Sequence, residues 1–163
     1  ATKGYPPSCF AKLPQLVERS GNGLNGVGSI TAFYTVLSEG DDPQDPIADA
    51  ARGILDGHIV LSRELAESGH YPAIDVEKSI SRVMGNVSPR EQVELARRAR
   101  GVLARVGKAR DLIQLGAYQA GHDLELDQAL QLHPQLVNLL QQDMHDRAPL
   151  AQSRAQLARL MAG

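Results

Sequence analysis

The sequence predicts an α/β segment that contains part of a parallel sheet, followed by an all-α segment. Residues 29–37 and 58–62 are rich in β-branched and aromatic side chains and are apolar on both faces, which is typical of buried strands. After Met84 the apolar residues recur at helical spacing and the strand signals end. We therefore expect residues 1–84 to form one domain and residues 85–163 to form a second, helical domain.

Charge and cysteine content limit the classes of function. The 163-residue chain has a formal net charge of −2, which argues against a strongly basic nucleic-acid binder. The charge is uneven, because residues 1–84 hold 7 Lys and Arg against 11 Asp and Glu, whereas residues 85–163 hold 10 against 8. Cys9 is the single cysteine and cannot form an internal disulfide. No signal peptide or long apolar run occurs, so a soluble protein in a reducing compartment is expected.

The first 28 residues predict a helix and a loop. Ser8 is a candidate N-cap for a helix through Arg19, with Pro14 either in its first turn or at a kink. Residues 21–28 contain the spacing Gly-x-Gly-x-x-Gly, which formally matches a dinucleotide fingerprint. That fingerprint needs a strand before it and a helix after it, and here the order is reversed. We therefore interpret these glycines as a flexible connector.

Residues 29–62 are expected to form a strand, a helix and a second strand. An acidic turn follows the first strand, and Asp45-Pro46 opens a helix through Asp56. The length suits a right-handed parallel crossover. Two parallel strands that are apolar on both faces do not make a stable sheet by themselves. Either further strands come from elsewhere in a longer protein or helices cover the pair, and we favour the first explanation, an incomplete sheet.

Tyr71 and Arg82 are the candidate functional residues of the stretch 69–84, which joins the two halves. Pro72 disfavours a helical conformation for Tyr71, which predicts a phenol ring held at a turn. A rigidly held ring suits a planar base, and a guanidinium suits phosphate oxygens. The alternative is that Tyr71 is a half-buried turn residue and Arg82 a solvated cation, which is the commoner situation for such residues.

A long helix is expected to begin the second half. Ser88-Pro89-Arg90-Glu91 has the form of a capping box with proline at the first helical position. The face opposite the apolar line of this helix is basic and consists of Arg97, Arg98, Arg100, Arg105, Lys108 and Arg110. These side chains could bind phosphates, but such a run is more often the solvated face of an amphipathic helix.

The remaining residues are expected to complete a helical hairpin with a polar tip and to add a last helix. Gly116 and Gly121 bracket a turn, and residues 123–127 begin the return helix. Pro134 is expected to break or kink that helix. Residues 149–161 have the apolar spacing of a last amphipathic helix.

The histidines and the cysteine give no signal of a metal site or a nucleophile. The five histidines never fall at the i, i+4 spacing of a helical metal site, so no metal held by protein side chains is predicted. Cys9 has no evident base nearby in the sequence, and spacing alone nominates no Ser, His and Asp group.

Several runs of residues together resemble a known family. The runs are Gly28-Ser-Ile-Thr-Ala-Phe-Tyr-Thr-Val-Leu37, Asp45-Pro-Ile-Ala-Asp49, Ile54-Leu-Asp-Gly-His-Ile-Val-Leu-Ser-Arg63, His70-Tyr-Pro-Ala-Ile-Asp-Val76 and Ser79-Ile-Ser-Arg-Val83. They are similar to the flagellum-specific and type III secretion export ATPases, which are close in fold to the catalytic subunit of rotary ATP synthases. The resemblance covers the whole chain, is dense from about Tyr5 to Met84 and is weaker in the helices.

The resemblance implies the C-terminal part of a RecA-like ATPase domain followed by a C-terminal helical domain. It implies hydrolysis of ATP with Mg as cofactor, with the phosphate-binding loop upstream of this chain, so that this chain alone would be inactive. On the family pattern, Tyr71 would stack on adenine. Arg82 would be the arginine finger that reaches the γ-phosphate bound by a neighbouring subunit of a homo-hexamer.

The resemblance also implies partners, the first of which is a central-stalk coiled-coil protein. The side chains expected to face it are, on an acidic loop, Asp41, Asp42 and Asp45, and, on the hairpin tip, Tyr118, Asp123, Glu125 and Asp127. Export chaperones or substrates and the export-gate membrane apparatus would be further partners. The implied location is cytoplasmic and peripheral to the inner-membrane export apparatus, and no nucleic acid is expected.

The sequence departs from the family pattern in two places. The tip lacks the dense acidic run of the synthase, which weakens the analogy with its stalk contact, and Gly85-Asn86 stands where a proline-containing turn is expected. Two other classes of function stay open. A hexameric RecA-like RNA helicase would use the basic face of the long helix, and a non-catalytic docking module would use the helical half.

Overall fold

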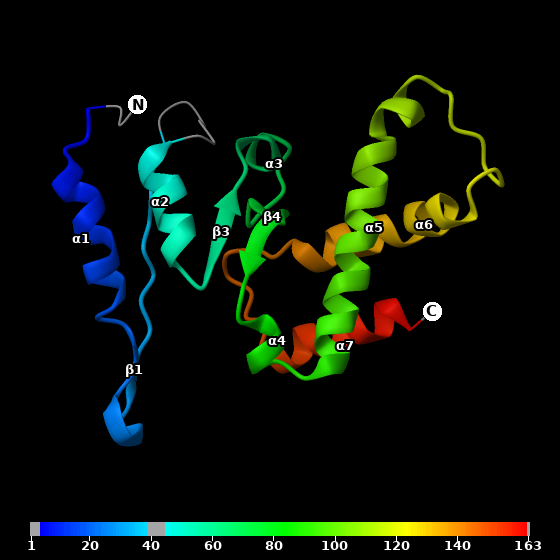
Figure 1. Cartoon of the computed structure of the whole chain (residues 1–163). Helices are drawn as coiled ribbons and strands as arrows, with labels where there is room; N and C mark the ends of the chain where they lie inside the picture. The colour runs from blue at the N-terminus through cyan, green and yellow to red at the C-terminus, as the bar shows by residue number, and fades with distance from the viewer. Residues whose placement is uncertain (1–3, 39–44, 163) are drawn as a thin grey trace. The chain divides into compact units, whose positions relative to one another are not determined.

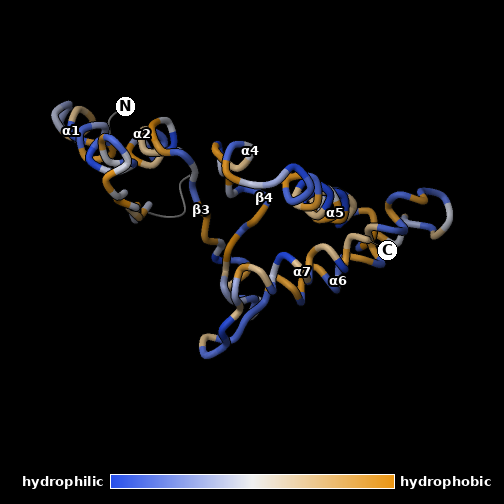
Figure 2. The backbone as a smooth tube through the Cα atoms, turned by 90° about the horizontal axis from the view of Figure 1, so that it is seen from below, coloured by the Kyte–Doolittle hydropathy of each residue, from blue (hydrophilic) through white to orange (hydrophobic). Residues whose placement is uncertain are grey.

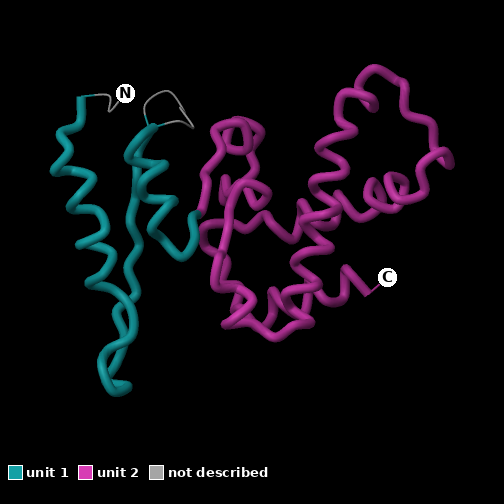
Figure 3. Tube along the Cα trace, in the orientation of Figure 1, with its two compact units in different colours: residues 1–58 teal, residues 59–163 magenta. Residues whose placement is uncertain are grey.

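The computed structural model describes residues 4–38 and 45–162. Figure 1 shows the order of its helices and strands, and Figure 3 shows its two compact units, Ala1–His58 and Ile59–Gly163. The boundary between the units falls within a strand, β3, which spans Gly57–Leu61. The predicted division into domains after Met84 stays a prediction.

The first unit contains two helices and a small hairpin. Helix α1 spans Pro7–Val17, with proline at its first position. The prediction of Ser8 as its N-cap is wrong, because Pro6 occupies that position. The helix also contains Pro14, which the sequence analysis placed in a first turn or at a kink. Helix α2 spans Pro46–Ile54 and begins where Asp45-Pro46 predicted.

The glycine-rich segment forms a hairpin. Strand β1, Gly21–Asn22, pairs antiparallel with strand β2, Ser29–Ile30, and the short 3-10 helix η1, Leu24–Gly26, lies between them. A Cβ atom at Gly23 would lie 2.1 Å from the backbone oxygen of Val27, so this position accepts glycine alone. The glycines therefore shape a tight turn.

The predicted central strand at 29–37 is wrong in most of its length. Beyond β2, residues 31–38 have no strand partner in the described structure, and every residue from 29 to 37 is exposed. Phe33, for example, is 87% exposed. The hydroxyl of Tyr34 donates to the backbone oxygen of Leu16 at 2.9 Å, which ties the segment to α1. An apolar strand needs neighbouring strands to bury it, and the described residues supply none here.

The predicted parallel crossover from residues 29–37 to residues 58–62 is also wrong, because β2 pairs with β1 and not with β3. Strand β3 pairs with strand β4, Ile74–Ser81, and the two arrows run in opposite directions in Figure 1. Helix α3, Arg63–Glu67, connects them, and Ser62 caps it by accepting a hydrogen bond from the Leu65 backbone at 3.3 Å. The described residues thus form two small two-stranded sheets and no parallel pair.

The rest of the second unit is helical, as predicted. Its helices are α4, Met84–Val87, α5, Arg90–Gln114, α6, Leu124–Leu140, and α7, Leu150–Met161. Figure 2 shows hydrophobic residues alternating with hydrophilic ones along α5, α6 and α7. Their core is centred on Ala99, Leu136 and Met161, with leucines of all three helices around it. Burial of Leu136, which is 1% exposed, contributes about 1.5–3 kcal/mol.

Two details of the predicted helices need correction. Ser88 does not cap α5, because no side chain bonds to the start of that helix. It ends α4 instead, where its backbone N–H donates to the oxygen of Met84 at 3.0 Å. Helix α5 begins one residue later than the capping box implies, with Pro89 in the N-cap position. A break in α6 at Pro134 is wrong as well, because the helix continues to Leu140.

Residues 4–38 and 45–162 lack a membrane-spanning helix and a metal-binding cluster. No helix there has both the length and the apolar character that crossing a bilayer demands. No group of three or more His, Cys, Asp or Glu side chains there has an arrangement that could hold a metal ion.

Candidate functional site

Tyr71 lies in the loop between α3 and β4. Its side chain is 56% exposed, and its backbone oxygen accepts a hydrogen bond from the backbone N–H of Gln142 at 2.9 Å. Gln142 belongs to the linker between α6 and α7, so the helices hold the backbone of this loop. The peptide bond between Tyr71 and Pro72 is cis. The ring is therefore presented at the surface from a fixed backbone position, which is the arrangement that the Tyr71-Pro72 pair predicts.

Arg82 lies at the other end of β4. It follows Ser81 directly, precedes α4 and is exposed. The two candidate nucleotide residues thus flank the same strand, Tyr71 before it and Arg82 after it. The roles of both residues toward a nucleotide stay predictions.

Strand β4 is bent between Asp75 and Ser79. The hydroxyl of Ser79 donates to the backbone oxygen of Asp75 at 2.6 Å, although four residues of a straight strand span about 13 Å. Asp75 Oδ1 accepts from the backbone N–H of Lys78 at 3.0 Å, and Asp75 Oδ2 lies 2.9 Å from Lys78 Nζ. We call this segment the Asp75–Ser79 bend.

The charges in the Asp75–Ser79 bend shift two pKa values. Partial burial would by itself raise the pKa of Asp75, but the side-chain and backbone hydrogen bonds from Lys78, with its charge, hold that pKa below the usual 3.8. The hydrogen bond to Asp75, and then the charge of that carboxylate, raise the pKa of Lys78 above 10.5. The bend is thus held by an ionised pair at neutral pH.

The neighbouring elements also contact the bend. The backbone N–H of Val60, in β3, donates to Ser79 Oγ at 3.0 Å. From α5, Arg100 Nη2 donates to the backbone oxygen of Glu77 at 2.8 Å and to that of Ser79 at 3.0 Å. Ser79 therefore joins its own strand, β3 and α5, and it does so three residues before Arg82.

The polar residues predicted at the hairpin tip lie together in the structure. Asp123 caps α6, because its Oδ1 accepts from the backbone N–H of Leu126 at 3.0 Å. The hydroxyl of Tyr118 donates to Asp127 Oδ1, and the backbone N–H of Gly121 donates to Asp127 Oδ2 at 2.8 Å. The hydrogen bond to Asp127, followed by partial burial and the charges of Asp127 and Asp123, raises the pKa of Tyr118 above 10.0.

Arg105 completes this network from α5. Its Nη2 forms an ion pair with Glu125, and its Nη1 lies 3.8 Å from Asp123 Oδ1. We call Arg105, Tyr118, Asp123, Glu125 and Asp127 the tip network. The four residues other than Arg105 are those predicted to face a partner. Tyr118 contacts Asp127, whereas Asp123 and Glu125 contact Arg105.

The acidic loop is described in part. Asp41 and Asp42 lie outside the described residues. Asp45 is 5% exposed and caps α2, because its Oδ1 accepts from the backbone N–H groups of Ile47 at 2.9 Å and Ala48 at 3.0 Å. A negative charge at a helix start is favourable, so Asp45 stabilises α2. Its predicted contact with a partner rests on the family resemblance.

Much of the predicted basic face of α5 has partners within the chain. Arg97 pairs with Glu94 of the same helix at 2.8 Å, and Arg110 pairs with Glu64 of α3 at 2.9 Å. Arg100 and Arg105 are engaged as described above. These contacts favour the interpretation of the run as the polar face of an amphipathic helix.

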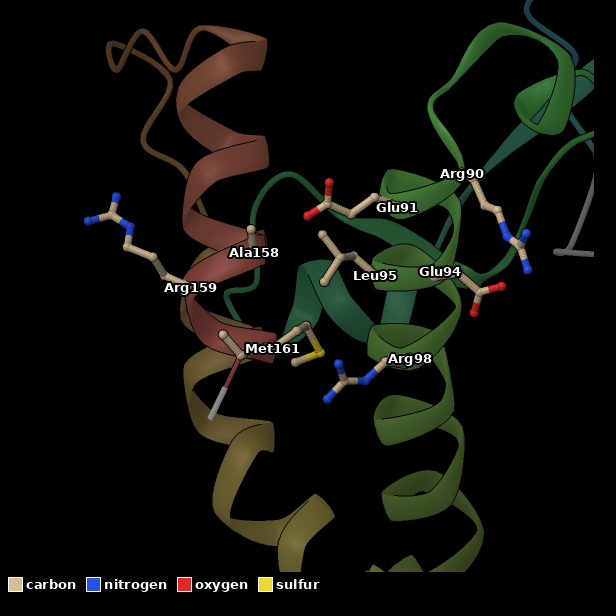
Figure 4. A pocket seen from close by; sticks show the side chains of 9 residues that line it. Arg90, Glu91, Glu94, Leu95, Arg98, Ala158, Arg159 and Met161 are labelled. Atoms are coloured by element: carbon tan, nitrogen blue, oxygen red, sulfur yellow. The ribbon is translucent and has the colours of Figure 1, made fainter.

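An open groove of about 740 Å³ lies between α5 and the end of α7. Figure 4 shows Leu95, Met161, Glu91 and Arg98 pointing into the space between the two helices, whereas Arg90, Glu94 and Arg159 point away from it. The lining contains no histidine, cysteine or serine that could act as a nucleophile or general base. The groove has the character of a surface contact region.

The bend and the arginine that holds it were not predicted from the sequence. Ser79 and Asp75 lie in runs that carried the resemblance, but no structural role was assigned to either. Arg100 was one of six basic residues on a helix face. Its sequence separation of 21 and 23 residues from its acceptors leaves no local signal by which spacing could single it out.

Two family models match the sequence. Residues 1–81 match the nucleotide-binding domain of the ATP synthase alpha/beta family. Residues 88–159 match the C-terminal domain of the type III secretion ATPase EscN.

Curated relatives match along nearly the whole chain. The flagellum-specific ATP synthase of Pseudomonas aeruginosa is 62% identical over 163 residues, which are 100% of this chain and 36% of that protein. The flagellum-specific ATP synthase of Salmonella typhimurium is 62% identical over 91% of this chain and 32% of its own length. The type 3 secretion system ATPase of Pseudomonas savastanoi pv. phaseolicola is 51% identical over 96% of this chain and 34% of its own length. The chain thus spans about a third of the length of these relatives.

Solved structures match as well. The assembled ATPase EscN from the type III secretion system of enteropathogenic E. coli has a TM-score of 0.91 and 44% identity, and the match covers 96% of this chain and 38% of that one. EscN in complex with its central stalk EscO has a TM-score of 0.84 and 42% identity, and the match covers 96% of this chain and 36% of that one.

Proposed function

Because this chain belongs to the flagellum-specific and type III secretion ATPases of the ATP synthase alpha/beta family, we propose that it is part of a ring-forming ATPase that drives protein export. The proposed reaction is hydrolysis of ATP by the full-length protein. The observation that supports it best is the exposed position of Arg82, three residues after the Asp75–Ser79 bend.

Arg82 is proposed to act on a nucleotide bound by a neighbouring subunit. During phosphoryl transfer, negative charge spreads over the γ-phosphate oxygens, and a guanidinium supplied from outside stabilises that charge. Such an arginine must lie at a surface and must approach from a fixed direction. Arg82 meets the first condition by its exposure and the second by following a strand whose bend several hydrogen bonds hold.

Tyr71 is proposed to stack on the adenine ring. More than half of its side chain is exposed, and the hydrogen bond from Gln142 fixes its backbone. A flat ring that is held in this way loses little conformational freedom when a base stacks on it. It would supply affinity for the base and leave the phosphate chemistry to other groups.

The cofactor of the proposed reaction is ATP with Mg. This chain contains no Gly-x-x-x-x-Gly-Lys-Ser/Thr motif, so the β-phosphate and γ-phosphate are proposed to bind elsewhere in the full-length protein. When bound, the metal ion would neutralise charge on those phosphates. The part that this chain plays is then confined to the base, through Tyr71, and to the neighbouring subunit's γ-phosphate, through Arg82.

The proposed partners follow from the relatives. EscN has been described as an assembled ATPase and in complex with a central stalk, EscO. We extend both to this protein: a homo-hexameric ring, and a coiled-coil stalk that meets the tip network. Export chaperones or substrates and the export-gate apparatus at the inner membrane are proposed as further partners, with the ring on the cytoplasmic side.

An RNA helicase is the less well supported alternative. It would need the basic face of α5 for RNA phosphates, but Arg97, Arg100, Arg105 and Arg110 already have partners in this chain. A docking module without catalysis is compatible with the groove between α5 and α7, whose lining contains no histidine, cysteine or serine.

Replacement of Arg82 by alanine in the full-length protein tests the proposal. We expect Arg82→Ala to lower kcat by about 10³-fold or more while ATP affinity stays nearly unchanged, since the finger acts on the transition state. Arg97→Ala, which removes another exposed arginine of this chain, is the matched control and should retain activity. Turnover of Arg82→Ala within a few-fold of wild type would show that the finger assignment is wrong.

A further inference from the structure

Arg100 makes an unusual contact for a residue on a helix face. Its Nη2 donates to two backbone oxygens of one strand, at 2.8 Å to Glu77 and at 3.0 Å to Ser79. This nitrogen carries two protons, so it can give one to each carbonyl. Both bonds are charge-assisted. The bond to Ser79 is partly buried, which reduces competition from water there, whereas the bond to Glu77 is exposed.

The two acceptors belong to the Asp75–Ser79 bend. In a straight sheet, neighbouring strands bind the carbonyl groups of a strand, but a bent strand cannot pair along its whole length. Side chains therefore hold the bend: Asp75 from within, and Arg100 from α5. Ser79 receives contacts from three directions, since its hydroxyl also binds Asp75 and Val60.

The chain runs from this anchored point to Arg82 in three residues. Three residues span at most about 10 Å, so a movement of Ser79 carries Arg82 with it. We propose that Arg100 is a positioning residue, which fixes the bend to the helical domain and thereby sets the approach of the Arg82 guanidinium to the nucleotide of the next subunit. This inference rests on the proposed function, in which Arg82 acts in trans.

The inference predicts which kinetic constant changes. A misplacement of about 1 Å at a reacting group can cost about 10²-fold in rate. Loss of the Arg100 contacts should therefore lower kcat by about 10-fold to 100-fold. The KM for ATP should stay within about 2-fold, because the inference assigns Arg100 no contact with ATP.

The experiment compares four forms of the full-length ATPase: wild type, Arg100→Ala, Arg100→Lys and Arg97→Ala. Arg97 lies on the same helix and pairs with Glu94 of that helix, so it is a matched control. We expect Arg100→Ala to show the loss in kcat, and Arg100→Lys to regain part of it, since an ammonium can still donate to one or both carbonyls. Arg97→Ala should match wild type. Arg100→Ala turnover within 2-fold of that control would overturn the inference.

A double variant separates positioning from a general structural effect. If Arg100 acts through Arg82, Arg82→Ala with Arg100→Ala should turn over no more slowly than Arg82→Ala alone. If the double variant loses kcat by the product of the two single-variant losses, the inference is overturned. If Arg100→Ala does not fold, as judged by thermal unfolding, Arg100→Lys takes its place in the cycle. If Arg100→Lys lowers kcat in the wild-type background but not in the Arg82→Ala background, the result supports positioning. If Arg100→Lys lowers kcat in both backgrounds, or in neither, the result contradicts it.

The same measurements distinguish failure of the inference from failure of the proposed function. If Arg82→Ala alone leaves turnover unchanged, the finger assignment fails, and the positioning role fails with it. If Arg82→Ala lowers turnover but Arg100→Ala does not, only the positioning role is wrong.

Discussion

Helix α5 supports two polar structures, and it does so in different ways. Arg100 binds the Asp75–Ser79 bend through backbone oxygens, whereas Arg105 binds the tip network through carboxylates. Backbone carbonyl groups do not titrate, and the bond from Arg100 to Ser79 is partly buried. Arg105 is 42% exposed and its partner Glu125 is 74% exposed, so salt and water compete for their ion pair.

This difference suggests different mechanical roles for the two regions. Contacts to backbone atoms fix the course of a strand, which suits a region that must aim a catalytic group. Exposed ion pairs contribute little energy and exchange partners easily, which suits a region that meets another protein. The following predictions test whether the bend is the rigid region and the tip the exchangeable one.

After the losses of turnover expected at Arg82 and Arg100, the next largest effect is expected at Tyr71, which precedes the strand that contains the bend. Tyr71→Ala should weaken ATP binding by about 1–3 kcal/mol, by analogy with base stacking on aromatic side chains. Titration of the full-length protein with ATP measures this change. Tyr71→Phe, which keeps the ring, should bind nearly as well as wild type. Equal affinity of the alanine and phenylalanine variants would remove Tyr71 from the adenine site.

A smaller effect is expected from Asp75→Asn, which removes the charge that holds the bend. We expect a loss of about 1–2 kcal/mol of unfolding free energy at neutral pH, because the charge-assisted bonds to Lys78 are lost. Thermal unfolding of the full-length protein measures it.

The pH dependence gives a second test of the same variant. The folded pKa of Asp75 is lowered, so its contribution is present above about 3.8 and is lost as the pH falls through the lowered value. The difference between wild type and Asp75→Asn should therefore shrink on acidification. Lys78 has a raised pKa, so its contribution is present below 10.5 and is lost as the pH rises through the raised value. A difference that does not change with acid would contradict the assigned ion pair.

The smallest effect is expected at the tip. Arg105→Gln should cost less than about 1 kcal/mol of unfolding free energy, and this cost should fall toward zero as salt screens the pair. Lys108→Gln removes the same charge from an exposed position on the same helix and serves as the control. A loss at Arg105 as large as that of Asp75→Asn, and independent of salt, would remove the distinction between the tip and the bend.

The elements that local signals define were predicted well. The Asp45-Pro46 pair marked the start of α2, Asp123 marked the start of α6, and the apolar spacing of residues 149–161 predicted α7. The family resemblance is confirmed by two family models and by relatives along nearly the whole chain. The roles of Arg82 and Tyr71 stay predictions.

The errors have a shared physical cause. The strand at 29–37 and the parallel crossover depend on pairing, and pairing depends on strands that a local pattern does not identify. Ser88 matched a capping pattern but serves the end of α4, a competing use of the same residue. The contact of Arg100 with the bend joins residues more than 20 positions apart, so no helical or strand period encodes it.

Mixed rings of full-length subunits test the central claim that Arg82 serves the neighbouring subunit. One kind of subunit carries Arg82→Ala, and the other keeps Arg82 but is defective in its own proposed phosphate-binding loop. Each kind alone should be nearly inactive. We predict that ATP hydrolysis returns on mixing, because the intact Arg82 of one subunit then faces the intact nucleotide site of the other. Hydrolysis by the mixture no greater than the sum of the two separate preparations would contradict the account.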